Sequence, residues 1–217
     1  MKKFTYITVT IALLFSSCDV LDRQPQDAVT PDLAFIDGKS ARSALVGLYS
    51  SLQPEAYYGA YFQYTNDNFA DITTFLGFYV GFQEVDSKNI PSTNDNIQQV
   101  WLGVYAAINV ANEIIDGVPG VPDENFSPEE RSEIIAQAKA IRALAYLDLL
   151  THWGEHWDTG SEFGLPLATT STGSNYANVV FLERSSVAAT YDLIVGDLED
   201  ALAVLEDSGD NTRINRA

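Results

Sequence analysis

The densest group of side chains that could bind a ligand lies between residues 57 and 82, where aromatic residues are interspersed with Asn, Asp, Gln and Thr. Aromatic rings stack on the apolar C–H faces of a sugar, and amide and carboxylate groups pair with its hydroxyls. Any single ring could instead pack the segment onto neighbouring helices. We therefore predict a carbohydrate site formed by the exposed members of Phe75, Phe78, Tyr79 and Tyr64, with Asn66 or Asp71 pairing hydroxyls.

A second pattern, His152-Trp-Gly-Glu155-His156, matches the H-x-x-E-H spacing of a class of zinc proteases. That chemistry requires both histidines on one face of a continuous helix, with the glutamate as base. Gly154 falls inside the pattern where the helix is expected to end, and the sequence offers no evident third ligand. We interpret the histidines as residues at a helix end and predict neither a metal nor another cofactor.

Two further groups of charged residues are interpreted as structural. Arg142 could bind an anion, but burial of a guanidinium requires a charged partner, so we favour an ion pair with a carboxylate such as Asp116 or Asp197. The 30 acidic residues include no carboxylate pair at positions typical of a glycosidase. The sequence therefore predicts a binding protein and not an enzyme.

The net charge limits the class of ligand. The 217 residues carry a formal charge of −18, and loss of the first 17 residues, which hold Lys2 and Lys3 and no acid, makes the charge −20. Such a chain repels phosphate backbones, so nucleic acid is excluded as a partner. Polyanionic glycans are disfavoured for the same reason, and a neutral oligosaccharide is favoured.

The amino terminus has the features of an export signal. Lys2 and Lys3 precede an apolar run over residues 4–15, which is too short to remain as a membrane-spanning helix. Ser16 and Ser17 then precede Cys18, the single cysteine of the chain. Residues 14–18 resemble the lipobox of bacterial lipoproteins, in which the signal is cut before the cysteine and the cysteine is acylated; the alternative is an ordinary secretory signal with an incidental cysteine. We predict a signal peptide over residues 1–17, acylation of Cys18, a tether over residues 18–31 that is broken by prolines, and a helical domain over residues 32–217.

The elements that must position these residues are helices. The longest, over residues 127–154, has a capping serine at Ser127, the capping-box acid Glu130, and Gly154 as a left-handed end. Apolar residues at three- and four-residue steps predict further helices over residues 34–52, over residues 96–116 and from about residue 185. We expect residues 96–116 and 127–153 to pack as an antiparallel hairpin. Residues 53–96 should form loops with short helical turns.

The last predicted helix begins a second hairpin whose return helix is missing from the sequence. We therefore expect the chain to be an amino-terminal part that stops before the second hairpin closes. On this interpretation the apolar face of the last helix, which includes Tyr191, Ile194 and Leu198, lacks its partner.

Several motifs, in order along the chain, resemble the SusD/RagB family of outer-membrane nutrient-uptake lipoproteins. They are Trp101-x-x-x-Tyr105-x-x-Ile108-x-x-Ala111-Asn112-x-x-Ile115, then Ala138-x-Ala140-x-Arg142-Ala143-x-Ala145-Tyr146-x-x-Leu149, then Gly164-Leu165-Pro166-Leu167, and finally Arg184-Ser185-Ser186-Val187. The lipoprotein signal agrees with this set. The chain departs from the family at His152-Trp153-Gly154, where an aliphatic or basic residue usually precedes an aromatic–glycine pair.

The resemblance implies an all-α fold of tetratricopeptide-like helical hairpins with long aromatic-rich loops. It implies a lipid-anchored protein on the extracellular face of the outer membrane, which binds a glycan or other oligomeric nutrient. It also implies a TonB-dependent transporter of the SusC type as partner, and no catalysis. The alternative is a helical-repeat scaffold that binds only protein. A scaffold has no need of the aromatic, amide-rich segment before Trp101.

Overall fold

The computed structural model describes residues 35–172, 181–207, 209 and 212–216. The chain divides into two compact units, Met1–Thr30 and Pro31–Ala217, and every described residue belongs to the second. The predicted signal peptide, the tether and Cys18 lie outside the described residues. No helix in the described part of the chain is long and apolar enough to cross a membrane.

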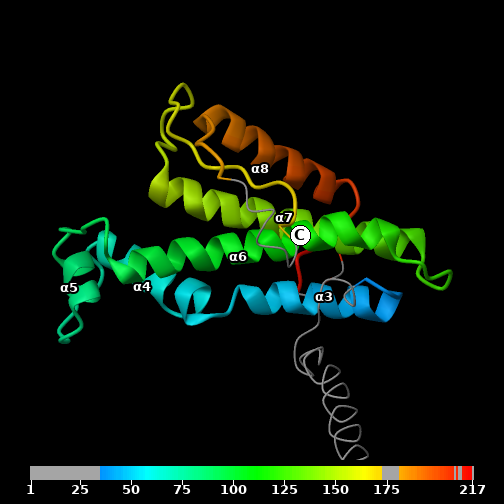
Figure 1. Ribbon diagram of the computed structural model, residues 1–217, viewed down its shortest axis with the longest axis horizontal. Coiled ribbons are helices and arrows are strands. Elements are labelled where there is room, and N and C mark those ends of the chain that lie inside the picture. Colours follow the sequence, from blue (N-terminus) through cyan, green and yellow to red (C-terminus); the bar gives the residue numbers. More distant parts are fainter. Residues whose placement is uncertain (1–34, 173–180, 208, 210–211, 217) are drawn as a thin grey trace, which may run out of the picture. The chain divides into compact units, whose positions relative to one another are not determined.

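The described residues form helices and no strands, which confirms the predicted all-α class (Figure 1). In chain order the elements are α3 (Gly38–Ser51), the π-helix η2 (Glu55–Gly59), α4 (Tyr61–Phe69), α5 (Val80–Asp86), α6 (Asp95–Gly117), the 3₁₀ turn η3 (Val118–Gly120), α7 (Pro128–Trp153) and α8 (Val187–Leu202). Short helices and loops therefore occupy the aromatic segment, as the sequence predicts.

Helices α6 and α7 form the expected antiparallel hairpin. Arg131 Nη1 donates to the carbonyl of Val118 just beyond the end of α6 (3.0 Å), and Arg142 Nη1 donates to Asn112 Oδ1 (2.7 Å). Further along α7, the ring of Trp153 packs on Trp101 near the start of α6, with centroids 5.3 Å apart. Later residues of α7 therefore contact earlier residues of α6, so the two helices run antiparallel.

The two outer long helices pack on this hairpin. Arg42 Nε donates to Glu130 Oε1 (2.7 Å) and Tyr49 Oη donates to Gln137 Oε1 (2.8 Å). Both pairs are separated by 88 residues, so α3 runs parallel to α7. On the other side α8 runs antiparallel to α7, and Figure 1 shows it along the edge of the hairpin away from α3.

Apolar packing among the described residues forms two large clusters and a small one, which joins Ala136 and Ala140 of α7 to Ala201 and Leu205. One large cluster joins α3, α6 and the first half of α7, and it includes Leu45, Leu48, Ile114 and Ile141. The other joins the start of α6, the second half of α7, α8 and η2. The second cluster fixes the end of the molecule that carries the aromatic segment.

The ends of α7 match the sequence in part. Ser127 Oγ accepts from the N–H of Glu130 (3.1 Å), as predicted, whereas the Glu130 carboxylate accepts from Arg42. The prediction of a left-handed Gly154 is wrong, because its φ is −120° and its ψ 166°. The extended backbone lets Glu155 N–H donate to the Phe163 carbonyl (3.0 Å). A Cβ on Gly154 would meet Leu150 Cδ1 at 2.5 Å and the Phe163 carbonyl oxygen at 3.1 Å, so a larger residue would have to displace the buried Leu150 side chain.

The expectation that α8 lacks a partner for its apolar face is wrong for two of the three residues named. Ile194 is buried in the cluster shared with α7. Tyr191 is half-buried, and its hydroxyl donates to the carbonyl of His156 (3.1 Å). Leu198 is exposed. Helix α7 provides the missing partner, because its alanines allow α8 to pack closely on its other side.

Candidate functional site

Five aromatic rings gather around α5 at one end of the hairpin. The ring of Phe82 packs against four others, at centroid distances of 4.6 to 5.3 Å, and we call this set the Phe82 cluster: Tyr61, Tyr64, Phe75, Tyr79 and Phe82. Most of these contacts are edge-to-face or tilted, which aromatic pairs favour. The cluster holds the loop between α4 and α5 in place.

The cluster accounts for three of the four predicted stacking rings. Tyr64 and Phe75 are half-buried, and the Tyr64 hydroxyl donates to the Phe82 carbonyl (3.2 Å). The Phe75 N–H donates to Asp86 Oδ1 (2.8 Å), and this bond lowers the pKa of the Asp86 carboxyl. Tyr79 packs on Phe82 at its edge and remains 46% exposed.

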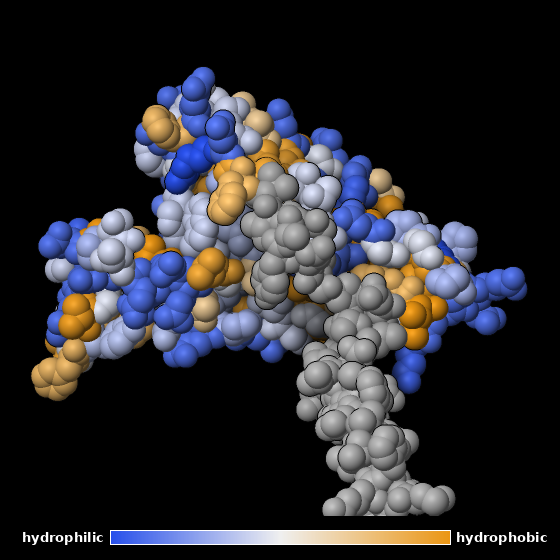
Figure 2. Space-filling model, viewed as in Figure 1, coloured by the Kyte–Doolittle hydropathy of each residue, from blue (hydrophilic) through white to orange (hydrophobic). Residues whose placement is uncertain are grey.

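Phe78, the fourth predicted ring, projects from the molecule and is 97% exposed. Leu76, Ile72 and Val80 beside it are also exposed, and we call the segment over residues 71–80 the α4–α5 loop. Figure 2 shows hydrophobic surface projecting at this end of the face drawn. Sequence reasoning did not single out Phe82, although its position on α5 determines which rings are buried.

The two predicted polar ligands are not adjacent to each other. Asp71 is exposed, has a positive φ of 57°, and its carboxylate forms an ion pair with Lys88 (2.8 Å). Asn66 is half-buried on α4, and its Oδ1 lies 2.5 Å from His152 Nε2 on α7. Asp71 therefore lies with the exposed rings, whereas Asn66 faces the long helix.

A polar network joins η2 to the end of α7. The hydroxyls of Tyr57 and Tyr58 both donate to Asp148 Oδ2, at 2.5 and 2.7 Å. Burial raises the pKa of the Asp148 carboxyl, although the two hydrogen bonds oppose this shift. Burial also lowers the pKa of His152, whose Nδ1 lies 2.8 Å from the Asp148 carbonyl. The network fixes η2 and α4 against α7. The lowered pKa favours the neutral form of His152.

The H-x-x-E-H pattern does not form one helical face. Helix α7 ends at Trp153, between the two histidines. Glu155 Oε2 accepts from Ser161 Oγ (2.6 Å), and His152 contacts Asn66. Within the described ranges, no group of three or more His, Cys, Asp and Glu side chains could hold a metal ion.

Arg142 is engaged by the protein itself. Its Nε and Nη2 donate to the two carboxylate oxygens of Asp197 on α8, each at 2.7 Å, and Nη1 donates to Asn112. Both side chains of the ion pair are buried, with 7% and 4% exposure. The predicted pairing is confirmed with Asp197; Asp116 accepts from the N–H of Ser171 instead.

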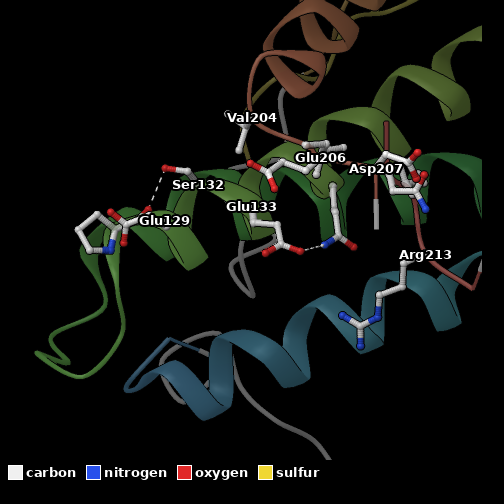
Figure 3. A pocket seen from close by; sticks show the side chains of 12 residues that line it. Glu129, Ser132, Glu133, Val204, Glu206, Asp207 and Arg213 are labelled. Carbon is white, nitrogen blue, oxygen red and sulfur yellow. Dashed lines mark hydrogen bonds between the residues drawn. The ribbon is translucent and has the colours of Figure 1, made fainter. Parts of the chain in front are cut away.

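A cavity of about 720 Å³ lies away from these aromatic residues. Figure 3 shows acidic side chains from α7 and from the carboxyl-terminal segment in its lining. The basic residue Arg213 also comes from the carboxyl-terminal segment. No aromatic ring is among the residues that line it. Because stacking groups are absent from its lining, we do not assign the glycan site to this cavity.

Taken with the fold, these features define an α-helical protein that carries an exposed aromatic loop at one end of a helical hairpin. Comparison with known proteins identifies its family. The model of the SusD-like family, described as "Starch-binding associating with outer membrane", matches residues 21–217. The chain belongs to this family of carbohydrate-binding, nutrient-uptake proteins.

Individual relatives agree. The SusD-like protein P25 of Formosa agariphila is 30% identical over 166 residues, which are 70% of this chain and 31% of that protein. A SusD superfamily crystal structure from Bacteroides thetaiotaomicron aligns with a TM-score of 0.70 and 27% identity, over 87% of this chain and 40% of that one. A laminarin-binding SusD-like protein, 20% identical, shares the fold with a TM-score of 0.64. The alignment covers 82% of this chain and 37% of that one. The chain thus spans less than half the length of each of these proteins.

Proposed function

We propose that the protein binds a neutral oligosaccharide through the α4–α5 loop. Phe78 and Tyr79 stack on the sugar rings, and Asp71 pairs with hydroxyls. Tyr64 and Phe75 support the loop from below. Asn66, whose Oδ1 contacts His152, supports the site by joining α4 to α7 and does not contact the sugar.

The exposure of Phe78 carries this proposal. A phenylalanine that is 97% exposed contributes little to folding, yet its loop is held by the Phe82 cluster. A loop whose backbone is held in place before binding loses little conformational freedom when a ligand stacks on its rings. The starch-binding description of the family and the laminarin-binding neighbour support a carbohydrate as that ligand.

A protein-binding scaffold is the second candidate function. The exposed aliphatic residues Leu76, Ile72 and Val80 favour it, since they add apolar area without a flat face. The two functions predict different responses to substitution. Sugar binding depends on Phe78 and Tyr79, whereas a protein interface depends as strongly on Leu76 and Ile72.

Calorimetric titration of the full-length protein with maltoheptaose, laminarihexaose, xylohexaose and mannohexaose tests the proposal. We expect at least one of them to bind, and Phe78→Ala or Tyr79→Ala to weaken binding by about 1–2 kcal/mol, on the scale of aromatic contacts. Leu202→Ala is the matched control, because Leu202 is about half-exposed at the far end of α8. Equal affinity in all variants would exclude the α4–α5 loop as the site.

We further propose that Cys18 is acylated, that the lipid holds the protein at the extracellular face of the outer membrane, and that the bound glycan passes to a TonB-dependent transporter of the SusC type. Binding without chemical change is sufficient for this role, so the proposal includes no catalysis. Cys18→Ala should move the protein from the membrane fraction to the soluble fraction. Unchanged fractionation would rule out the anchor.

A further inference from the structure

The loop that follows α7 exposes a tryptophan that the α4–α5 site does not use. Trp157 is 73% exposed, and Phe163 in the same loop is also exposed. The other two tryptophans of the chain, Trp101 and Trp153, are half-buried and pack on each other. We call residues 154–164 the Trp157 loop. Trp157 therefore adds little to the core and is available to a ligand.

Backbone hydrogen bonds fix the Trp157 loop at both of its ends. The Glu155 N–H donates to the Phe163 carbonyl (3.0 Å), and the Val187 N–H donates to the Ser161 carbonyl (2.9 Å). Gly164 N–H donates in turn to the Ser185 carbonyl (3.0 Å). The loop is thus held closed across its base and bound to the start of α8.

The tip of the loop is fixed as well. The Asp158 N–H donates to the Glu155 carbonyl (2.9 Å), and Asp158 Oδ1 accepts from the Gly160 N–H (2.9 Å). The indole of Trp157 packs edge-on against the His156 ring, with centroids 5.1 Å apart and planes at 80°. An indole held in this way presents a flat face without further ordering on binding.

The chemistry around this indole fits a neutral sugar. Asp158, Thr159 and Glu162 are exposed beside it and can accept or exchange hydrogen bonds with hydroxyls. The loop contains no Lys or Arg. The nearby Arg184 uses its guanidinium to donate to the carbonyls of Trp153 and Gly164, at 2.9 and 2.7 Å. An anionic ligand would therefore meet carboxylates without a free opposing charge in this loop.

The Trp157 loop lies at the same end of the helices as the α4–α5 loop. It leaves α7 at Gly154, two residues after His152, which contacts Asn66 of α4. Figure 1 shows the loop after α7 and the α4–α5 region at the same end of α6 and α7. One extended ligand could therefore contact both.

We infer that the Trp157 loop is a second stacking site for a neutral oligosaccharide, separate from the α4–α5 loop and engaged by another part of the same chain of sugars. The inference rests on the proposed glycan-binding function. Two sites on one ligand make affinity rise with oligosaccharide length, because the second contact is intramolecular once the first has formed.

Substitution of Trp157 tests the inference by titration calorimetry with the full-length protein. The probes are maltotriose and maltoheptaose, laminaritriose and laminarihexaose, xylohexaose and mannohexaose. We expect Trp157→Leu to weaken binding of the longest ligand about 5- to 10-fold, the fold-change of one aromatic contact. Trp157→Phe, which keeps a flat ring, should retain most of the affinity. Since Trp157 is exposed, thermal unfolding of both variants should match the parent.

Fluorescence supplies a second measurement. With Trp157→Phe as the reference for the two half-buried tryptophans, the signal of Trp157 is obtained by difference. We expect a bound oligosaccharide to shield it from acrylamide quenching. The inference is overturned if a sugar binds and neither Trp157→Leu nor quenching responds. If only Phe78→Ala then loses binding, the proposed function of the α4–α5 loop stands. If only Trp157→Leu loses binding, the result supports a glycan site at the Trp157 loop and not at the α4–α5 loop. No binding by any probe overturns both.

Discussion

At the scale of single residues, the ion pair between Arg142 and Asp197 is the charge interaction that we expect to respond most to substitution, because both side chains are buried. Removal of one partner leaves the other charge buried without compensation. We expect Asp197→Ala to lower the free energy of unfolding by about 3–5 kcal/mol, measured by urea denaturation. The double variant Arg142→Met, Asp197→Leu should recover much of this loss. A double variant that is less stable than Asp197→Ala would contradict this account.

His152 gives the protein a dependence on pH. Burial lowers its folded pKa, so the folded state holds the proton more weakly than the unfolded state does. The stability that neutral His152 contributes is complete above its unfolded pKa of about 6.5 and is lost as pH falls through the folded value. We expect His152→Gln to lose less stability than the parent between about pH 7 and about pH 5.

Asp148 changes the pH dependence of stability in the opposite direction. Burial raises its pKa, so the folded state binds a proton more readily than the unfolded state does. Both proteins retain Asp148, whose pKa His152 lowers, so the difference between their pH profiles reports the histidine together with its interaction with Asp148. Chemical denaturation across this range measures it. Parallel profiles would show that His152 is not responsible.

At the scale of elements, two glycines at α8 have opposite roles. A Cβ on Gly164 would meet the Ser186 carbonyl oxygen at 2.5 Å, so the turn cannot approach α8 with a larger residue. A Cβ on Gly196, inside α8, would meet nothing within 4 Å. We expect Gly164→Ala to destabilise the protein by about 1–3 kcal/mol and Gly196→Ala to stabilise it by up to about 1 kcal/mol. Thermal unfolding with the reverse order would refute this.

The helices could be predicted from sequence, because their apolar spacing and caps are local. For Arg142 the sequence predicts a carboxylate partner such as Asp116 or Asp197. Which carboxylate it meets depends on the antiparallel packing of α8, which spacing alone does not determine. The ligand site is harder to predict from sequence than the helices are. Phe75 and Phe78 have the same chemistry, and only their contact or lack of contact with Phe82 separates a supporting ring from an exposed one.

At the scale of the whole molecule, the two aromatic loops share an end because η2 and α4 are joined to the last turns of α7. Tyr57 and Tyr58 donate to Asp148, and Asn66 contacts His152. Helix α8 then fixes the Trp157 loop through Tyr191 and Val187. The hairpin therefore acts as a frame that holds loops from distant parts of the sequence at one end, as the proposed two-site binding of one glycan requires.

If the proposed glycan binding holds, the net charge of the chain should limit which glycans bind. A net charge of −18 creates a repulsive field around anionic sugars, while neutral sugars do not respond to it. We expect whichever neutral probe binds to keep the same affinity when the ionic strength rises from about 0.01 M to about 0.15 M, which shortens the screening length from about 30 to about 8 Å. Oligogalacturonate of matched length should bind more weakly, and its affinity should rise with salt as the repulsion is screened. Titration calorimetry at both salt concentrations measures this. Tighter binding of the acidic ligand at low salt would mean that local cations dominate the site and that the charge argument for a neutral ligand is wrong.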